Sequence, residues 1–389
     1  MFDFEFYNPT HIVFGKNKIT QLDKLVPAKA TVLITFGGGS AKRSGLFDRV
    51  KAELEKSGRS VLEFGGIPSN PRFDVLMEAV NVVRENKVDF ILALGGGSVM
   101  DGTKFISFAS YHKEYFGKER ELIHLGNLPT AVAPVPFGTV VTMPATGSEM
   151  NNGFVISDGE DKMACFSPAL FPKFSILDPE NTFTLPARQV ANGVVDAFEH
   201  VVEQYVTYPV DGRFQDRVAE GILQTLVEVG ETTVKNPQDY DSRANLVWCA
   251  AMALNGLISA GVPQDWTAHM IGHELTALFG IDHGRTLACV QPAIWKVRRE
   301  QKKAKLLQYA ERVWGIVNGS DDERIDAAIT RTEAFFTSLG VETRLSEHGV
   351  KAADIDRVVA NLEKHGMTAL SETRDLDLDV ARKILETAL

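Results

Sequence analysis

Residues 89–104 read DFILALGGGSVMDGTK, and their pattern indicates the fold class of the chain. Its apolar run, residues 89–94, is typical of a buried strand; three glycines follow, and a helical pattern begins at once. The same order occurs earlier, where TVLITF (31–36) precedes GGGS (37–40). Repeated units of strand, glycine turn and helix indicate a parallel, doubly wound sheet with helices on its faces.

Neighbouring segments extend this α/β pattern. VLEF (61–64) is a third short strand, while FDRVKAELEKSG (47–58) and FDVLMEAVNVVRENK (73–87) carry apolar residues three and four positions apart, which is the helical period. The apolar segments TAVAPVPFGTVVTMP (130–144) and FSILDP (174–179) continue the pattern, but their order in the sheet cannot be assigned.

The pattern changes after Pro186, because the remaining segments have helical periodicity and almost no strand signal. The predicted helices cover residues 187–206, 214–234, 242–259, 265–280 and 286–300, and charged amphipathic helices follow from about residue 321. We therefore expect two domains: an α/β dinucleotide-binding domain over residues 1–186 and an all-helical metal-binding and catalytic domain over 187–389.

Composition excludes several classes of protein. The 389 residues are 44% hydrophobic and 24% charged, which is typical of a globular chain, and 41 basic against 51 acidic residues give a net charge of −10. Nucleic acid is therefore not an expected partner. Three cysteines at wide spacing fit no disulfide framework, and neither a signal peptide nor an apolar run of about 18 residues is evident. We expect a cytoplasmic protein without a membrane span.

The glycine turns are candidate phosphate sites. Glycines after parallel strands let a phosphate approach the backbone, and the N–H groups of the following helix favour an anion. The alternative is a pair of tight turns that need positive φ. A third cluster, PATGSE (144–149), adds hydroxyls after another apolar segment and could line the same crevice or be a plain loop.

Histidines and one aspartate form a second constellation. Asp196 and His200 are spaced i, i+4, His269 and His273 repeat that spacing, and His283 follows ten residues later. Such spacing places the paired side chains on one helix face. A single such histidine is more often a core residue, but burying the set is costly without a cation. Oxygen and imidazole ligands suit Zn²⁺ or Fe²⁺. HMIGHE differs from the metallopeptidase motif H-E-x-x-H, so peptidase chemistry loses support.

Together these motifs resemble the iron-containing, or group III, alcohol dehydrogenases, and within them the branch of NADPH-dependent aldehyde reductases and butanol dehydrogenases. The likeness spans nearly the whole chain. It rests on NPTHIVFGK (8–16), GGGSVMDGTK (95–104), PATGSEM (144–150), GVVDAFEH (193–200) and the run H-x-x-x-H-x(9)-H from His269 to His283. The family's architecture, shared with dehydroquinate synthase, has a dinucleotide lobe followed by a helical metal lobe.

The resemblance implies roles for particular residues. The metal ligands would be Asp196, His200, His269 and His283, and His273 would face the substrate as a proton-relay or pocket residue. The implied cofactor contacts are Gly38, Gly39, Ser40, Asn70, Gly95, Gly96, Gly97, Ser98, Asp101, Thr142, Thr146 and Lys162. Trp266, Gln264 and Phe154 are candidates for a pocket wall. A homodimer is also expected from the resemblance alone.

Position 39 bears on the choice of cofactor. NAD-specific relatives generally carry an Asp there, whose carboxylate would repel a 2′-phosphate, whereas this chain has Gly39 with Lys42 and Arg43 close behind. We therefore expect NADP(H). The expected reaction is hydride transfer between the nicotinamide and a small aldehyde or primary alcohol, with one divalent ion as Lewis acid, zinc before iron.

Three rival functions remain open at this point. A dehydroquinate-synthase-like lyase would need several Lys and Arg residues near the metal, and residues 196–283 contain only Arg213, Arg217, Lys235 and Arg243. A glycerol-dehydrogenase-like enzyme would turn over polyols and ignore butanal. A nucleotide-sensing protein would use the metal only as a structural support.

Overall fold

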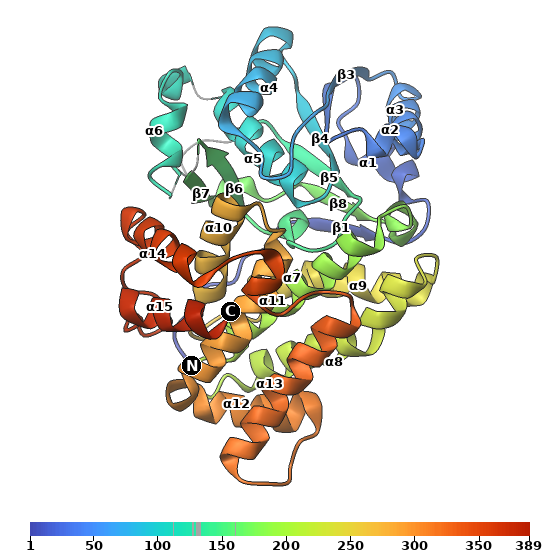
Figure 1. Cartoon of the computed structure of the whole chain (residues 1–389). Coiled ribbons are helices and arrows are strands. Elements are labelled where there is room, and N and C mark those ends of the chain that lie inside the picture. The colour runs from blue at the N-terminus through green and yellow to red at the C-terminus, as the bar shows by residue number, and fades with distance from the viewer. Residues whose placement is uncertain (112, 127, 130–133, 160) are drawn as a thin grey trace. The chain divides into compact units, whose positions relative to one another are not determined.

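The computed structural model of the chain describes residues 1–111, 113–126, 128–129, 134–159 and 161–389 (Figure 1). The backbone divides into two compact units, Tyr7–Leu185 and a second unit made of Met1–Phe6 with Pro186–Leu389. This division differs from residues 1–186 and 187–389 chiefly at the start of the chain, where Phe2 N donates a 2.9 Å hydrogen bond to Gly261 O of the helical unit.

The first unit contains a parallel sheet, as predicted, and this sheet has six strands. The strands are β1 (His11–Phe14), β2 (Thr31–Phe36), β3 (Ser60–Phe64), β4 (Phe90–Gly95), β5 (Phe137–Val141) and β8 (Phe174–Leu177), in the order β1-β8-β5-β4-β2-β3. Each pairing in this sheet is parallel. β5 and β8 fall within the two apolar segments whose order could not be assigned; residues 130–133 of the first segment lie outside the described residues.

Helices cover both faces of this sheet, as Figure 1 shows. The helices of this unit are α1 (Leu22–Leu25), α2 (Ser40–Arg43), α3 (Leu46–Glu55), α4 (Phe73–Asn86), α5 (Gly97–Tyr111) and α6 (Glu119–Ile123). On one face, buried strand residues such as Val32, Ile34 and Leu92 form a continuous core with residues of α1 and α3. Alternate residues, such as Leu33 and Ile91, are equally buried and point to the other face, because successive side chains alternate along a strand.

An antiparallel hairpin accompanies the sheet and was not predicted. It consists of β6 (Gly153–Asp158) and β7 (Asp161–Phe166), paired from Gly153↔Phe166 to Asp158↔Asp161. Its strand β6 packs against α5, so the hairpin lies close to the glycine turn that begins that helix.

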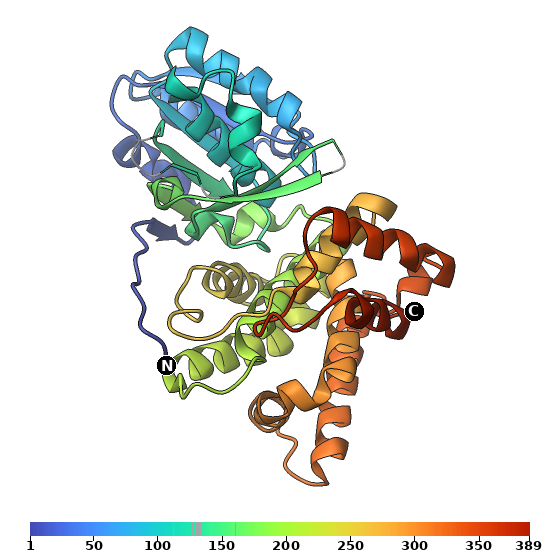
Figure 2. The same ribbon diagram turned by 90° about the vertical axis from the view of Figure 1, so that its left-hand side faces the viewer.

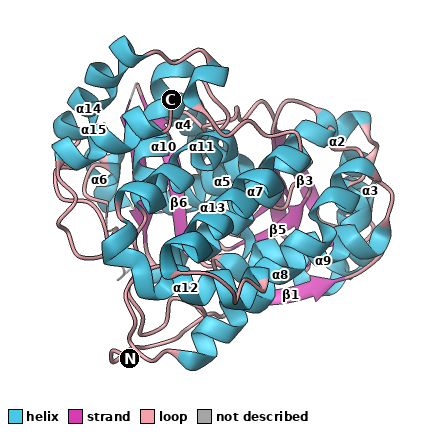
Figure 3. Ribbon diagram, turned by 60° about the horizontal axis from the view of Figure 1, so that its bottom comes forward, coloured by secondary structure: helices cyan, strands magenta, loops and turns pink. Residues whose placement is uncertain are grey.

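The second unit is helical, which confirms the predicted class. Its helices are α7 (Ala187–Tyr205), α8 (Arg213–Lys235), α9 (Tyr240–Ala253), α10 (Thr267–Phe279), α11 (His283–Val297), α12 (Arg299–Trp314), α13 (Asp321–Ser338), α14 (Ile355–Lys364) and α15 (Leu378–Thr387). Figures 2 and 3 show these helices packed on one another. α7 is buried along most of its length, with α8, α9 and α11 against it.

None of the described helices combines the length and the apolar character that crossing a bilayer requires. Cys165, Cys249 and Cys289 are all buried free thiols, in keeping with the absence of a disulfide pattern in the sequence.

Candidate functional site

The two GGGS turns lie at the point where the strand order reverses. From β2 the chain passes outward to β3 and then returns to β4 on the other side of β2. β2 and β4 are neighbours in register, with Phe36 opposite Leu94, and each is followed at once by its glycine turn. A crevice at the carboxyl ends of strands at such a reversal is where open α/β sheets bind ligands.

The first turn depends on glycine because of its backbone conformation. Gly39 has φ +91° and directly precedes α2, and an added Cβ at Gly38 would meet nothing within 4 Å. Ser40 is the first residue of α2. A ligand could therefore approach the backbone at Gly38 closely.

The second turn depends on glycine because of a close approach. A Cβ at Gly97 would lie 2.5 Å from Thr146 Cγ2, and one at Gly96 would lie 2.9 Å from Met143 Cβ. Thr142 N donates to Gly95 O at 3.0 Å. The structure thus brings Gly95, Gly96 and Gly97, with Ser98 beside them in the first turn of α5, together with Thr142 and Thr146.

Asp101, a predicted cofactor contact, makes two hydrogen bonds within the first unit. One carboxylate oxygen accepts from Ser148 Oγ at 2.6 Å and the other from Val155 N at 2.9 Å. Burial raises the pKa of this carboxyl, opposed by the charge of Lys104 and these hydrogen bonds. The side chain therefore fastens the PATGS turn and β6 to α5.

Lys104 was not singled out by the sequence, yet it completes this attachment. Its fully buried ammonium donates to Ser148 Oγ and Asn151 Oδ1 at 2.8 Å and to Gly153 O at 2.7 Å. Burial lowers its pKa to about 8. A lysine one helical turn after Asp101 is the only sequence signal for this role.

The other predicted cofactor contacts are more dispersed. Asn70 is exposed, has φ +54° and lies in the loop between β3 and α4. Lys162 lies on β7, where its charge contributes weakly to the pKa of Asp101. Behind Gly39, the Lys42 ammonium pairs with the Glu63 carboxylate and lies 4.7 Å from the ring centroid of Phe47.

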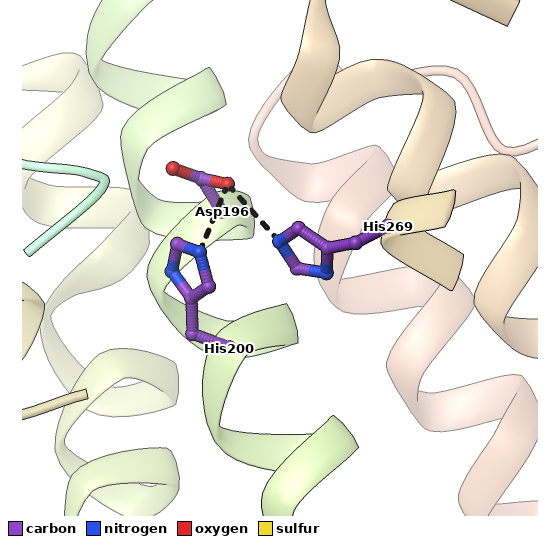
Figure 4. Close-up of side chains that lie close together, drawn as sticks. All are labelled: Asp196, His200 and His269. Atoms are coloured by element: carbon purple, nitrogen blue, oxygen red, sulfur yellow. Dashed lines mark ion pairs between the residues drawn. The ribbon is translucent and has the colours of Figure 1, made fainter. Parts of the chain in front are cut away.

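The candidate metal centre lies in the helical unit. Asp196 and His200 project from α7 toward His269 of α10, and Figure 4 shows the three side chains pointing at one another. All three are buried, and one ligand atom of each lies within 4.8 Å of the others. Their i, i+4 spacing on α7 is what places Asp196 and His200 on one face.

Imidazole nitrogens converge on one carboxylate oxygen. Asp196 Oδ1 lies 3.9 Å from His200 Nε2, 3.9 Å from His269 Nε2 and 3.7 Å from His283 Nε2. These distances are too long for hydrogen bonds. Zinc–ligand bonds of about 2.1 Å would allow ligand atoms to stand up to about 4.2 Å apart around one ion. Asp196, His200 and His269 therefore fit a divalent cation. His283, the predicted fourth ligand, lies at the start of α11 and is close to the same carboxylate oxygen.

The charge around these donors also fits a cation. Glu199 and Glu203 of α7 are almost completely buried. Burial, followed by the negative charges of Glu203 and Asp196, raises the pKa of Glu199 well above its ordinary value. A divalent ion is the kind of charge that would relieve this repulsion.

Glu203 is a second residue that the sequence did not reveal. Its Oε2 contacts His269 Nδ1, and its Oε1 accepts from Ala268 N at 2.6 Å. Burial and the charge of Asp265 raise its pKa, against the opposing effects of the α10 N–H groups and Lys302. The residues that Glu203 contacts are distant in sequence, so no local motif predicts these contacts.

The predicted proton-relay and pocket residues have different surroundings. His273 is half-buried on α10, with its ring centroid 5.1 Å from that of His283. The ring of Trp266 lies 5.3 Å from that of His269, and its Nε1 donates to Gln264 Oε1 at 2.9 Å. Phe154 as a pocket wall is wrong, because it is 1% exposed and packs edge-on against Phe105 of α5.

Comparison with known proteins agrees with this fold and this donor set. Residues 9–179 match the family described as Iron-containing alcohol dehydrogenase, and residues 190–389 match Fe-containing alcohol dehydrogenase family, C-terminal. The chain belongs to the iron-containing alcohol dehydrogenase family. The family resemblance inferred from the motifs is thereby confirmed.

Among its relatives is the NADPH-dependent aldehyde reductase YqhD of Escherichia coli strain K12, which is 55% identical over 100% of both chains. A crystal structure of E. coli YqhD superposes with a TM-score of 0.97 at 54% identity, covering 100% of this chain and 99% of that one. The NADH-dependent butanol dehydrogenase A of Thermotoga maritima gives a TM-score of 0.93 at 33% identity, covering 100% and 99%.

Proposed function

We propose that this protein is a metal-dependent NADP(H) alcohol dehydrogenase that acts as an aldehyde reductase on small aldehydes. The observation that carries the proposal is the convergence of three imidazole nitrogens on Asp196 Oδ1 within the helical unit. Membership of an alcohol dehydrogenase family and the 55% identity to an aldehyde reductase support it. The comparisons give the lyase and polyol alternatives no support.

Asp196, His200, His269 and His283 would hold one divalent ion. Bound there, the ion would supply a Lewis acid that polarises the substrate carbonyl. Asp196 brings one negative charge, so three neutral imidazoles and one carboxylate would leave the site a net positive charge that favours an approaching oxygen. His273, near His283 but outside the converging set, is proposed to move a proton to or from the substrate oxygen.

The glycine turns are proposed to hold the cofactor. Gly95, Gly96, Gly97 and Ser98 would bind the pyrophosphate at the start of α5, with Thr142 and Thr146 beside them. Asn70 and Lys162 are proposed contacts further out. Asp101 is a further proposed cofactor contact, and it also holds the PATGS turn.

Preference for NADP(H) is proposed from the first turn. Gly38, Gly39 and Ser40 offer backbone and hydroxyl donors, and the sequence places no carboxylate at position 39 to repel a 2′-phosphate. Lys42 is close by but paired with Glu63, so a bound phosphate would compete with that carboxylate for the ammonium. That YqhD is an NADPH-dependent enzyme supports this choice.

The proposal also covers the identity of the metal, the oligomeric state and the location. Zinc is proposed before iron because imidazole and carboxylate ligands accept both and the affinity order favours zinc. A homodimer in the cytoplasm, without nucleic-acid partners, is proposed from the family resemblance and the net charge of −10.

The test follows NADPH and NADH oxidation with butanal, using chelated protein and the same protein reloaded with Zn²⁺ or Fe²⁺. Reloaded wild type should prefer NADPH, and Asp196→Asn should stay inactive with either metal. His365→Asn is the matched control, since His365 pairs with Glu274 outside the donor set, and it should retain metal-dependent activity. If no reloaded wild-type sample oxidises either cofactor, the proposed function is wrong.

A further inference from the structure

Glu203 links two helices at the candidate metal centre. It belongs to α7, which also carries Asp196 and His200, and its carboxylate reaches the first turn of α10, which carries His269. The side chain is completely buried, and both of its oxygens are engaged.

The two carboxylate oxygens of Glu203 contact different groups of α10. Oε1 accepts from Ala268 N at 2.6 Å, one of the N–H groups that a helix leaves without an internal partner at its N-terminus. Trp266, at the N-cap of α10, has φ +65° and provides no side-chain cap, so Glu203 provides the cap from another helix. Oε2 contacts Nδ1 of the His269 ring.

The contact at Nδ1 determines which ring nitrogen of His269 points toward Asp196. With Nδ1–H donating to Glu203, the Nε2 lone pair is directed toward Asp196 Oδ1, 3.9 Å away. A carboxylate on the outer nitrogen of a ligating histidine fixes the tautomer and raises the basicity of the other nitrogen.

The start of α10 is also held by its backbone and by Asp265. Asp265 N donates to the backbone carbonyl oxygen of Glu203 at 2.9 Å, and the Asp265 carboxylate lies 2.8 Å from the buried ammonium of Lys302. Lys302 also pairs with Glu372 at 2.9 Å and donates to Val206 O at 3.0 Å. The start of α10 is thus anchored to α12 as well as to α7.

We infer that Glu203 is a positioning residue for metal binding, which orients His269 and fixes the start of α10 against α7 so that the donors from the two helices converge. This inference rests on the proposed function, because it requires that the donor set holds a divalent ion. It adds a residue outside the donor set whose loss should weaken the metal site.

The chain contains a matched control on the same helix. Glu274 of α10 is also buried, and its carboxylate accepts from His365 Nδ1 at 2.7 Å and Asn361 Nδ2 at 3.2 Å. It therefore makes the same kind of Glu–His pair, but His365 does not belong to the set that converges on Asp196. Substitution of Glu274 therefore shows how much stability is lost when a buried Glu–His pair on α10 is broken.

The experiment measures the Kd of Zn²⁺ for the full-length wild type, Glu203→Gln, Glu203→Ala, Glu274→Gln and Asp196→Asn by competition with a chromophoric chelator. Melting temperature and NADPH affinity are recorded in parallel. Glu203→Gln should bind Zn²⁺ about 10- to 100-fold more weakly. Glu203→Ala should bind it more weakly still. Both should keep wild-type NADPH affinity. Glu274→Gln should melt earlier but keep the wild-type Kd.

Two outcomes overturn the inference alone. One is a Zn²⁺ Kd within twofold of wild type for a folded Glu203→Gln, and the other is an equal loss of affinity in Glu274→Gln. If wild type and Asp196→Asn bind Zn²⁺ equally, the metal site itself is wrong and the proposed function fails with it. Glu203→Gln keeps the volume of the side chain, so it remains informative if Glu203→Ala does not fold.

Discussion

At the scale of single residues, Glu149 carries a charge that the fold opposes. It is 1% exposed, and neither carboxylate oxygen accepts a hydrogen bond from another described residue. Burial raises its pKa to about 7, with partial opposition from the backbone of Glu149 itself and from Lys104. Because its ordinary value is 4.5, the folded protein binds more protons than the unfolded chain between about pH 4.5 and 7. Stability from this group is greatest below that window and falls as the pH rises through it.

Glu149→Gln should therefore flatten the dependence of stability on pH. Between pH 5 and pH 8 we expect wild type to lose on the order of 1–3 kcal/mol that the variant keeps. Amide exchange in β5 and β8 checks this, since the Glu149 backbone oxygen accepts from Ser175 Oγ of β8 at 2.6 Å. Equal pH dependence in the two proteins would show that Glu149 does not titrate in this range.

Residue-level prediction succeeded where a local pattern carries the chemistry. Asp196 and His200 of α7 could be recognised as a pair because helical spacing alone places their two side chains on one face. Glu203 and Lys104 could not be recognised, because their partners are far away in sequence. The position of Asp101 in the motif predicts a cofactor contact, but it could not reveal the hydrogen bonds from Ser148 and Val155.

At the scale of elements, the metal donors depend on how closely α11 approaches α7. A Cβ at Gly284, the second residue of α11, would lie 2.6 Å from the backbone oxygen of Asn192 on α7. A backbone atom cannot move aside as a flexible side chain can, so alanine would displace α11 and with it His283. Gly284→Ala should cost about 1–3 kcal/mol of stability. It should also weaken Zn²⁺ binding.

Gly221→Ala on α8 is the control for this prediction, because nothing lies within 4 Å of an added Cβ there. It should preserve Zn²⁺ affinity and raise stability by up to about 1 kcal/mol through helix propensity. Urea midpoints followed by tryptophan fluorescence, together with the Zn²⁺ Kd, compare the two variants. A wild-type Kd and midpoint for Gly284→Ala would mean that the helices accommodate the extra methyl group.

Helices and strands could be predicted where their buried apolar residues recur at a clear helical or strand period. β2 begins and ends at the predicted residues, and α7 and α13 match amphipathic segments closely. The hairpin β6–β7 was missed because most of its residues are only half-buried, which weakens the alternation. Strand order depends on long-range pairing such as Thr139↔Ser175, which no local pattern encodes.

At the scale of the whole molecule, the two proposed ligands belong to different units. The metal donors lie on α7, α10 and α11 of the helical unit, while the glycine turns follow β2 and β4 of the sheet. Trp248, Trp266, Trp295 and Trp314 are the only tryptophans of the chain, and all four belong to the helical unit. Tryptophan fluorescence therefore reports unfolding of the unit that is proposed to bind the metal.

Removing the metal should act first on that unit. An ion at 100 to 1,000 times its Kd stabilises the form that binds it by about 2.7–4.1 kcal/mol. Chelation should therefore lower the urea midpoint seen by tryptophan fluorescence and raise amide exchange most in α7, α10 and α11, with the smallest change in β2 and β4. Asp196→Asn should show neither response to the chelator. An ion held only by donors of the helical unit stabilises that unit directly. Equal acceleration of amide exchange in the helices and the strands would therefore contradict a local effect of the metal.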